Sequence, residues 1–76
     1  MDDKKSFVEN ELLNILKQVD DAISYTEYRY FEIQNAEIVT VTYQDNYSTM
    51  ININHCNSKM KIVNRVSGKL LLKVLR

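Results

Sequence analysis

Two residues of this 76-residue chain could ligate a metal or act as a nucleophile and base, and they are neighbours, His55 and Cys56. Adjacent residues of an extended chain point to opposite sides, so these two side chains cannot readily form a catalytic dyad. A structural zinc site needs four Cys or His ligands, and the sequence supplies two. We therefore interpret His55 and Cys56 as polar residues at the end of a strand, and expect no metal and no cofactor.

Three carboxylates, Glu27, Glu32 and Glu37, could serve general acid–base catalysis. Such catalysis requires a pKa tuned by burial or by a partner. Glu32 is expected on a solvent-exposed face and Glu37 beside a turn, where nothing recognisable buries or pairs them. Gly68 is the only glycine, which excludes a Gly-rich phosphate loop. The sequence therefore predicts a protein that is not an enzyme.

The length predicts a single domain, residues 1–76. The single cysteine and the absence of a signal-like apolar stretch indicate a reducing, cytoplasmic location. The longest apolar run, residues 70–72, is far shorter than the roughly 20 residues of a membrane span, so no membrane association is expected.

The first element is expected to be a helix over about residues 6–23. Ser6 and Glu9 fit a capping box at its start. Its apolar residues recur at helical spacing and form one stripe: Val8, Leu12, Ile15, Leu16, Val19 and Ile23.

Three strands are expected next, over residues 28–33, 37–43 and 47–54, because these segments are rich in β-branched and aromatic residues that alternate with period two. A three-residue turn at residues 44–46 places Val39 opposite Ile51 and keeps the apolar residues on one face. Asn46 can adopt the left-handed conformation that such a turn needs. A turn of the same length at residues 34–36 places Phe31 opposite Val39.

This register predicts a sheet with one apolar face and one wet face, as an antiparallel sheet allows. The predicted core face carries Phe31, Ile33, Val39, Val41, Tyr43, Tyr47, Ile51 and Ile53, with Arg29 and Thr49. The predicted wet face carries Tyr28, Tyr30, Glu32, Ile38, Thr40, Thr42, Ser48, Met50, Asn52 and Asn54.

The last segment, residues 58–76, fits two structures. As a helix it begins at the N-cap Ser58, and Gly68 costs about 1 kcal/mol inside it. As a hairpin it turns at residues 66–69 and adds a fourth and a fifth strand. We favour the helix, because two helices can cover one face of a lone sheet. The expected fold class is thus α+β with the order α-β-β-β-α.

A tight hairpin (residues 43–47), an Asn-bearing strand (residues 51–54) and a capped helix from Ser58 resemble a pattern in small phage and mobile-element proteins. The whole α-β-β-β-α order is similar to that of some phage-encoded anti-CRISPR proteins and of the double-stranded-RNA-binding domain. The resemblance is one of layout, and no functional residue carries over from it. It implies a small accessory or inhibitor protein.

Two surfaces are candidates for function. The first is the wet face, where tyrosines supply contact area at low entropic cost and favour a protein partner. The residues expected to bind that partner are Tyr28, Tyr30, Thr40, Thr42, Met50 and Asn52.

The second surface is the basic side of the last segment, which could follow the phosphates of a nucleic acid. Residues 39–76 carry six basic residues and one acidic residue, whereas residues 1–38 carry four basic residues and nine acidic residues. The alternative explanation is that an acidic first helix pairs with a basic last helix. The candidate nucleic-acid-binding residues are Lys59, Lys61, Arg65, Lys69 and Lys73.

The two edge strands, residues 28–33 and 47–54, contain no proline and few charges. Such edges favour strand addition, and the neutral net charge provides little repulsion between molecules. The last segment also has more apolar residues than one apolar stripe requires, the additional ones being Leu71, Leu72 and Leu75. The sequence therefore predicts a weak homodimer at high concentration.

Overall fold

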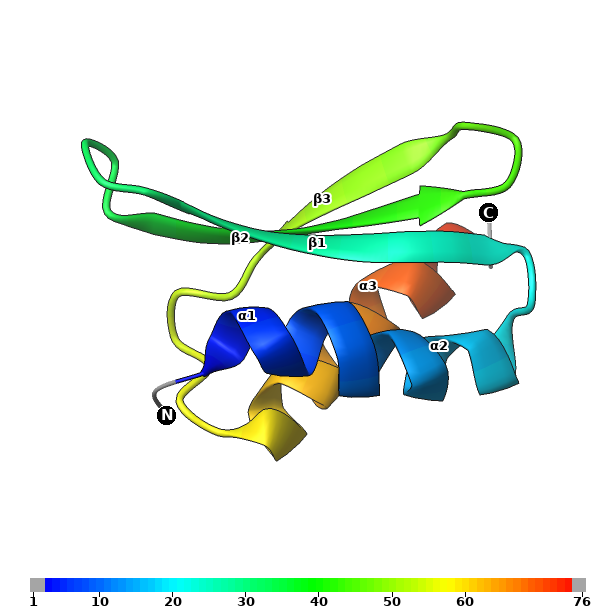
Figure 1. The fold of residues 1–76 in the computed structure, drawn as a ribbon, viewed down its shortest axis with the longest axis horizontal. Helices are drawn as coiled ribbons and strands as arrows, with labels where there is room; N and C mark the ends of the chain where they lie inside the picture. The colour runs from blue at the N-terminus through cyan, green and yellow to red at the C-terminus, as the bar shows by residue number, and fades with distance from the viewer. Residues whose placement is uncertain (1–2, 75–76) are drawn as a thin grey trace.

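Three antiparallel strands form an open sheet, and two helices cover one of its faces (Figure 1). The computed structural model describes the backbone of residues 3–74 and the side chains of residues 3–71. The strand order is β1-β2-β3, so the predicted α-β-β-β-α layout is confirmed. Within residues 3–74 no helix has the length and apolar character needed to span a membrane.

The first helix runs from Lys4 to Val19 as α1 (Lys4–Ser6), the π-helical segment η1 (Phe7–Leu12) and α2 (Leu13–Val19). The side chain of Asp3 accepts a hydrogen bond from the Ser6 amide at 3.3 Å and caps the helix, so the predicted capping box is wrong. The wider turn of a π-helix shifts the phase of the residues that follow it. Val19, which follows this segment and was expected on the apolar stripe, is 77% exposed, and Phe7, which was not expected on the stripe, is buried.

The helix ends at Val19, earlier than predicted, because Asp20 adopts an extended conformation and its carboxylate accepts a hydrogen bond from the Ala22 amide at 3.0 Å. This Asx turn leads directly into β1 (Ile23–Phe31). The first strand thus begins five residues before its predicted start, and Ile23 is a buried strand residue.

The second hairpin joins β2 (Ala36–Tyr43) to β3 (Ser48–Asn52) in the predicted register, with Val39 opposite Ile51. Asn46 has φ 70°, and its amide donates to the Tyr43 carbonyl at 3.0 Å. The three-residue turn with a left-handed asparagine is therefore confirmed.

The first hairpin has a different register from the one expected. Tyr28, not Phe31, lies opposite Val39, and Phe31 pairs with Ala36. The loop between the strands has four residues, 32–35, and ends on Asn35 with φ 49°. A shift of three residues reverses the faces of β1. Phe31 and Ile33, predicted in the core, are 38% and 96% exposed.

The last segment is the helix α3 (Lys59–Val74), which continues through Gly68 without interruption. The Ser58 hydroxyl accepts a hydrogen bond from the Lys61 amide at 3.2 Å, as an N-cap does. The helix is therefore confirmed over the alternative hairpin.

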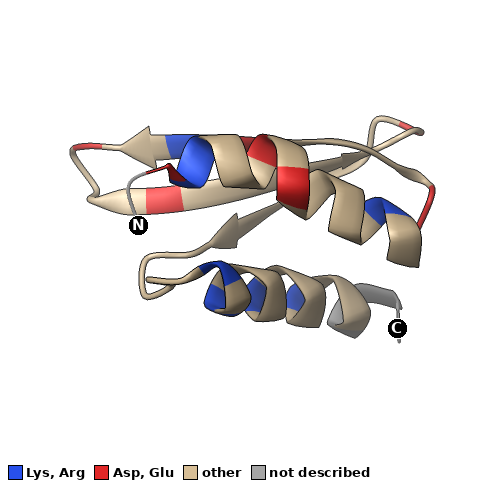
Figure 2. Ribbon diagram, turned by 60° about the horizontal axis from the view of Figure 1, so that its bottom comes forward, with Lys and Arg blue, Asp and Glu red and all other residues tan. Residues whose placement is uncertain are grey.

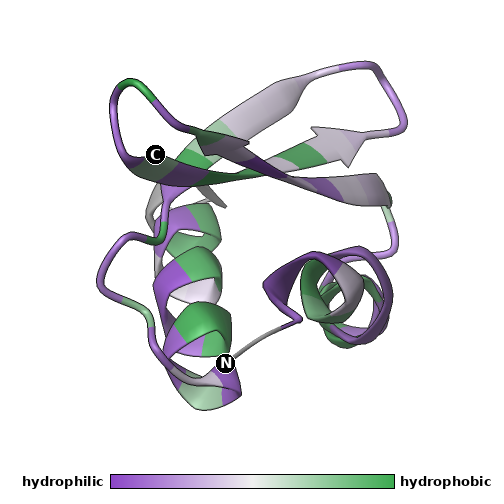
Figure 3. Cartoon of the chain, turned by 60° about the vertical axis from the view of Figure 1, so that its left-hand side comes forward, coloured by the Kyte–Doolittle hydropathy of each residue, from purple (hydrophilic) through white to green (hydrophobic). Residues whose placement is uncertain are grey.

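The core lies between the sheet and the two helices, where their apolar surfaces face each other (Figure 3). The first helix, the sheet and α3 each contribute buried side chains, and Ile53 and Cys56 add two more from the segment that leads to α3. The other buried apolar residues are Phe7, Val8, Leu12 and Leu16 of the first helix, Ile23, Val39, Val41 and Ile51 of the sheet, and Ile62, Val66 and Leu70 of α3.

Candidate functional site

The residues predicted to form one partner-binding face lie on two faces. Because Tyr28 is opposite Val39 and Tyr30 is opposite Glu37, both tyrosines belong to the side of the sheet that the helices cover. The remaining four, Thr40, Thr42, Met50 and Asn52, lie on the uncovered side. The expected grouping is therefore wrong, and its cause is the register of the first hairpin.

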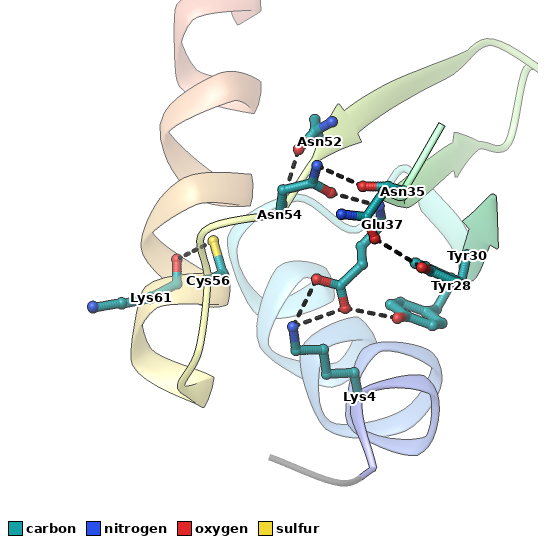
Figure 4. Close-up of polar contacts among 9 residues, drawn as sticks. All are labelled: Lys4, Tyr28, Tyr30, Asn35, Glu37, Asn52, Asn54, Cys56 and Lys61. Atoms are coloured by element: carbon teal, nitrogen blue, oxygen red, sulfur yellow. Dashed lines mark hydrogen bonds and ion pairs between the residues drawn. The ribbon is translucent and has the colours of Figure 1, made fainter. Parts of the chain in front are cut away.

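The two tyrosines take part in a polar network at one end of the sheet (Figure 4). The Tyr28 hydroxyl donates to Glu37 Oε1 at 2.8 Å, and the Tyr30 hydroxyl donates to Asn35 Oδ1 at 2.8 Å. Lys4 donates to both carboxylate oxygens of Glu37, at 2.8 and 2.9 Å. These contacts join the first helix to the first hairpin.

Glu37 is held as a carboxylate. Burial disfavours its charge, but the hydrogen bonds from Lys4 and Tyr28 and the charge of Lys4 outweigh burial, so the pKa of Glu37 lies below its ordinary value. Desolvation, and then the hydrogen bond to Glu37, raise the pKa of Tyr28 to about 12. Glu37 was expected to be a solvated charge, and the structure instead places it in a network in which both of its oxygens are occupied.

Asn54 extends this network to the segment after β3. Its Oδ1 accepts from the Glu37 amide at 2.6 Å and its Nδ2 donates to the Asn35 carbonyl at 3.0 Å. The Asn54 amide in turn donates to Asn52 Oδ1 at 2.8 Å. The side chain of Asn54 is thus committed to holding the fold.

The uncovered side of the sheet presents a different set of side chains from the predicted one. Tyr25, Phe31 and Met50 are exposed there, at 52%, 38% and 66%, and Thr40 is half-buried between the strands. Thr42 lies on this side but is buried. Tyr25 was missed because β1 was expected to begin at residue 28, and because an irregularity between Ile23 and Tyr25, which a period-two pattern does not predict, places Tyr25 on the uncovered side.

The cations of α3 behave differently at its two ends. Lys59 lies 3.6 Å from Glu11 and 5.5 Å from the centre of the Phe7 ring. Lys61, Arg65 and Lys69 are exposed, and within residues 3–71 none of them forms an ion pair. Figure 2 shows the basic residues along α3. The acidic helix therefore pairs with one of these four cations only. The side chain of Lys73 lies outside the described residues.

A polar cleft of about 320 Å³ separates the end of β3 from the first half of α3. Arg65 Nε donates to the Asn52 carbonyl at 3.0 Å across it. Its lining contains no carboxylate: Asn52, Asn54, His55, Cys56, Lys61, Asn64 and Arg65. Lys61 and Arg65 were predicted from the sequence as candidate nucleic-acid-binding residues. Asn64, which falls between them on the same helix, was missed.

His55 and Cys56 are separated in burial as well as in direction. Cys56 is buried, and its thiol lies 3.6 Å from the Lys61 carbonyl, whereas His55 is exposed. Among the described residues, no three His, Cys, Asp or Glu side chains are grouped so that they could hold a metal ion. The pair contributes to the wall of the cleft.

Comparisons of the chain with protein-family models, with curated protein sequences and with solved structures give no significant match. The similarity to anti-CRISPR proteins and to the double-stranded-RNA-binding domain therefore stays a resemblance of layout. The function has to be argued from the residues of this chain.

Proposed function

We propose that the protein binds nucleic acid through a row of three cations on α3. This row, called the α3 row below, consists of Lys61, Arg65 and Lys69. The observation that carries the proposal is that all three are exposed and that, within residues 3–71, no carboxylate pairs with them. No acidic residue follows Asp45 in the sequence, so this side of the molecule has a locally positive potential although the net charge is zero.

The spacing of the α3 row suits a chain of phosphates. Residues four apart on a helix are on nearly the same side, and each step advances about 6 Å along the axis. Three phosphate contacts predict weak binding that does not depend on sequence. The logarithm of the association constant should fall with the logarithm of salt concentration with a slope of about −2 to −3. The affinity should therefore fall about 15- to 60-fold between about 50 and 200 mM salt.

Fluorescence anisotropy with labelled single-stranded and duplex oligonucleotides tests this proposal. The variant Lys61→Gln/Lys69→Gln should bind about tenfold or more weakly at low salt, and its salt slope should fall to about −1, because one contact remains. The control Lys5→Gln/Lys17→Gln changes the net charge by the same amount on the first helix and should leave binding unchanged. Equal losses in the two variants, or no binding by the wild-type protein at about 50 mM salt, would contradict the proposal.

A second candidate is a protein-binding module that uses the uncovered side of the sheet, as an accessory or inhibitor protein of phage type would. The observation that favours it is the exposure of Tyr25, Phe31 and Met50 on a face that neither helix covers. Aromatic and methionine side chains are enriched at the centres of protein interfaces. These residues replace Tyr28 and Tyr30 in the binding surface.

Affinity capture from a host lysate tests this candidate when it includes matched tyrosine variants. Tyr25 and Tyr30 are equally exposed, at 52%, but lie on opposite faces of β1. Tyr25→Ala should release the captured partner and Tyr30→Ala should retain it. A partner that is indifferent to Tyr25→Ala and to Met50→Ala rules out this surface.

A further inference from the structure

Arg65 is oriented within the cleft between β3 and α3 before any ligand binds. Its Nε donates to the Asn52 carbonyl at 3.0 Å, which fixes one edge of the planar guanidinium. A guanidinium has five N–H donors, so four remain on the two terminal nitrogens. A fork of this kind matches two oxygens of a phosphate group and is already positioned for it.

Two further residues of α3 line the same cleft. Lys61 lies one helical turn before Arg65 and forms no ion pair within residues 3–71, and Asn64 adds a side-chain amide. In contrast, Asn54, which also lines the cleft, is committed to the Glu37 amide and the Asn35 carbonyl. With cations and amides but no carboxylate in its lining, the cleft favours a small group of high negative charge.

From this geometry we propose that the cleft binds a phosphomonoester, the terminal phosphate of a nucleic-acid strand. A monoester carries about −1.5 to −2 charges at neutral pH, more than the single charge of a diester. The cleft lies between the end of β3 and α3 and is lined by the first two cations of the α3 row, Lys61 and Arg65. A strand whose backbone follows the α3 row from Lys69 can therefore place its terminal phosphate in the cleft between Arg65 and Lys61.

This inference rests on the proposed nucleic-acid binding, but the cleft could also take the same chemical group from a free nucleotide. The volume of about 320 Å³ is at the lower end of the range for small-molecule sites and would accommodate one nucleotide. The experiment therefore needs separate arms for a strand end and for a free phosphomonoester.

Binding is measured by anisotropy for three single-stranded oligonucleotides of one sequence, with a 5′-phosphate, a 3′-phosphate or hydroxyls at both ends. A phosphorylated strand should bind about tenfold more tightly than the hydroxyl strand. Arg65→Lys keeps the charge of the α3 row but removes the fork, so it should abolish this preference while hydroxyl-strand binding persists. The control Lys69→Gln should weaken all three strands equally and keep the preference.

Amide chemical shifts during titration with a nucleoside monophosphate complete the test. If the hydroxyl strand binds and a terminal phosphate adds nothing, the inference is overturned and the proposed function stands. If no strand binds but the monophosphate shifts the amides of residues 52–65, the cleft is a phosphomonoester site for a free nucleotide and the proposed function fails. If neither a strand nor the monophosphate binds, both are overturned.

Discussion

The two strands that flank β2 are attached to the molecule by different means. β3 is held by apolar burial, because Ile51 and the following Ile53 pack into the core with 2% and 0% exposure. β1 is held near its middle by polar contacts to the first helix. The Thr26 hydroxyl donates to the Val8 carbonyl, and the Tyr28 amide donates to a carboxylate oxygen of Glu9.

This difference shows that one sheet can be fixed by two kinds of interaction that respond to different perturbations. Apolar burial is lost when a side chain is truncated and changes little with pH. Hydrogen bonds to carboxylates are lost when either partner is removed and weaken when the carboxylate is protonated. The predictions below separate these two responses.

The largest effect on stability is expected at β3, the strand that is held by apolar burial. Ile51→Ala should lower the free energy of unfolding by about 2–5 kcal/mol, because it removes a buried side chain and leaves a cavity. Phe31→Ala should cost less than about 1 kcal/mol, because this ring is 38% exposed on the uncovered side. Urea denaturation of both variants measures the difference. A cost of several kcal/mol for Phe31→Ala would restore the register predicted from the sequence.

The next effect is expected at Glu37 of β2, which links Tyr28 of β1 to Lys4 of the first helix. Glu37→Ala removes a carboxylate that accepts from Lys4 and Tyr28, and should cost about 2 kcal/mol at neutral pH. Glu32→Ala is the control, because Glu32 is exposed in the loop, and its effect should stay within about 0.5 kcal/mol.

The cost of Glu37→Ala should depend on pH with a defined sign. The folded state lowers the pKa of Glu37, so its stabilisation is complete above the unfolded value near 4.5 and is lost as the pH falls through the folded value. Wild-type and variant stabilities should therefore converge in acid. If the difference in stability between the wild type and Glu37→Ala stayed constant down to strongly acidic pH, the charged carboxylate would not be the source of the stabilisation.

A smaller effect is expected from Tyr28 in alkali. The folded state raises its pKa from 10 to about 12, so its contribution is complete below pH 10 and is lost as the pH rises toward 12. Tyr28→Phe should lose about 1 kcal/mol at neutral pH and show less alkaline destabilisation than the wild type. Ultraviolet difference titration checks the assignment, since a tyrosine that ionises only near pH 12 should disappear in the variant.

The same comparison explains which parts of the fold follow from the sequence. In the second hairpin the apolar residues alternate on both strands, so only one register buries Val39 with Ile51. In the first hairpin Phe31 and Ile33 suggest a core face, but Thr26 and Tyr28 occupy it. The Thr26 hydroxyl finds its acceptor on the first helix, and the Tyr28 hydroxyl finds its acceptor on Glu37, which is itself held by the distant Lys4.

The candidate site follows from the sequence to a similar extent. The cations of α3 are visible as a four-residue repeat once the helix is assigned, and the structure adds that three of them form no ion pair within residues 3–71. The cleft itself could not be predicted, because it depends on how the segment after β3 returns to α3. The bond between Arg65 and the Asn52 carbonyl joins two elements whose relative position no local pattern specifies.

The weakest effect concerns the two edges of the sheet. The Tyr43 amide donates to Tyr47 and the Ile53 amide to Glu37, so the alternation of an antiparallel ladder turns the backbone groups of Ser48, Met50 and Asn52 away from β2. Arg65 covers the Asn52 carbonyl only. On the opposite edge, Glu9 accepts from the Tyr28 amide and blocks strand addition near the middle of β1.

We therefore expect weak homodimerisation at millimolar concentration through β3, because neither this strand nor the residues that flank it, over positions 46–54, carry a charge. An antiparallel pair centred on Met50 brings both Met50 side chains together, so Met50→Lys should give a monomer by placing two like charges side by side. Met60→Lys is the control, because Met60 is 69% exposed on α3, compared with 66% for Met50.

Sedimentation equilibrium at two salt concentrations distinguishes two mechanisms of association. Association through β3 should be insensitive to salt, whereas contact between the acidic and basic halves of two chains should weaken as salt rises. A wild-type protein that stays monomeric at millimolar concentration would contradict association through β3 and show that the covered Asn52 carbonyl protects this edge sufficiently.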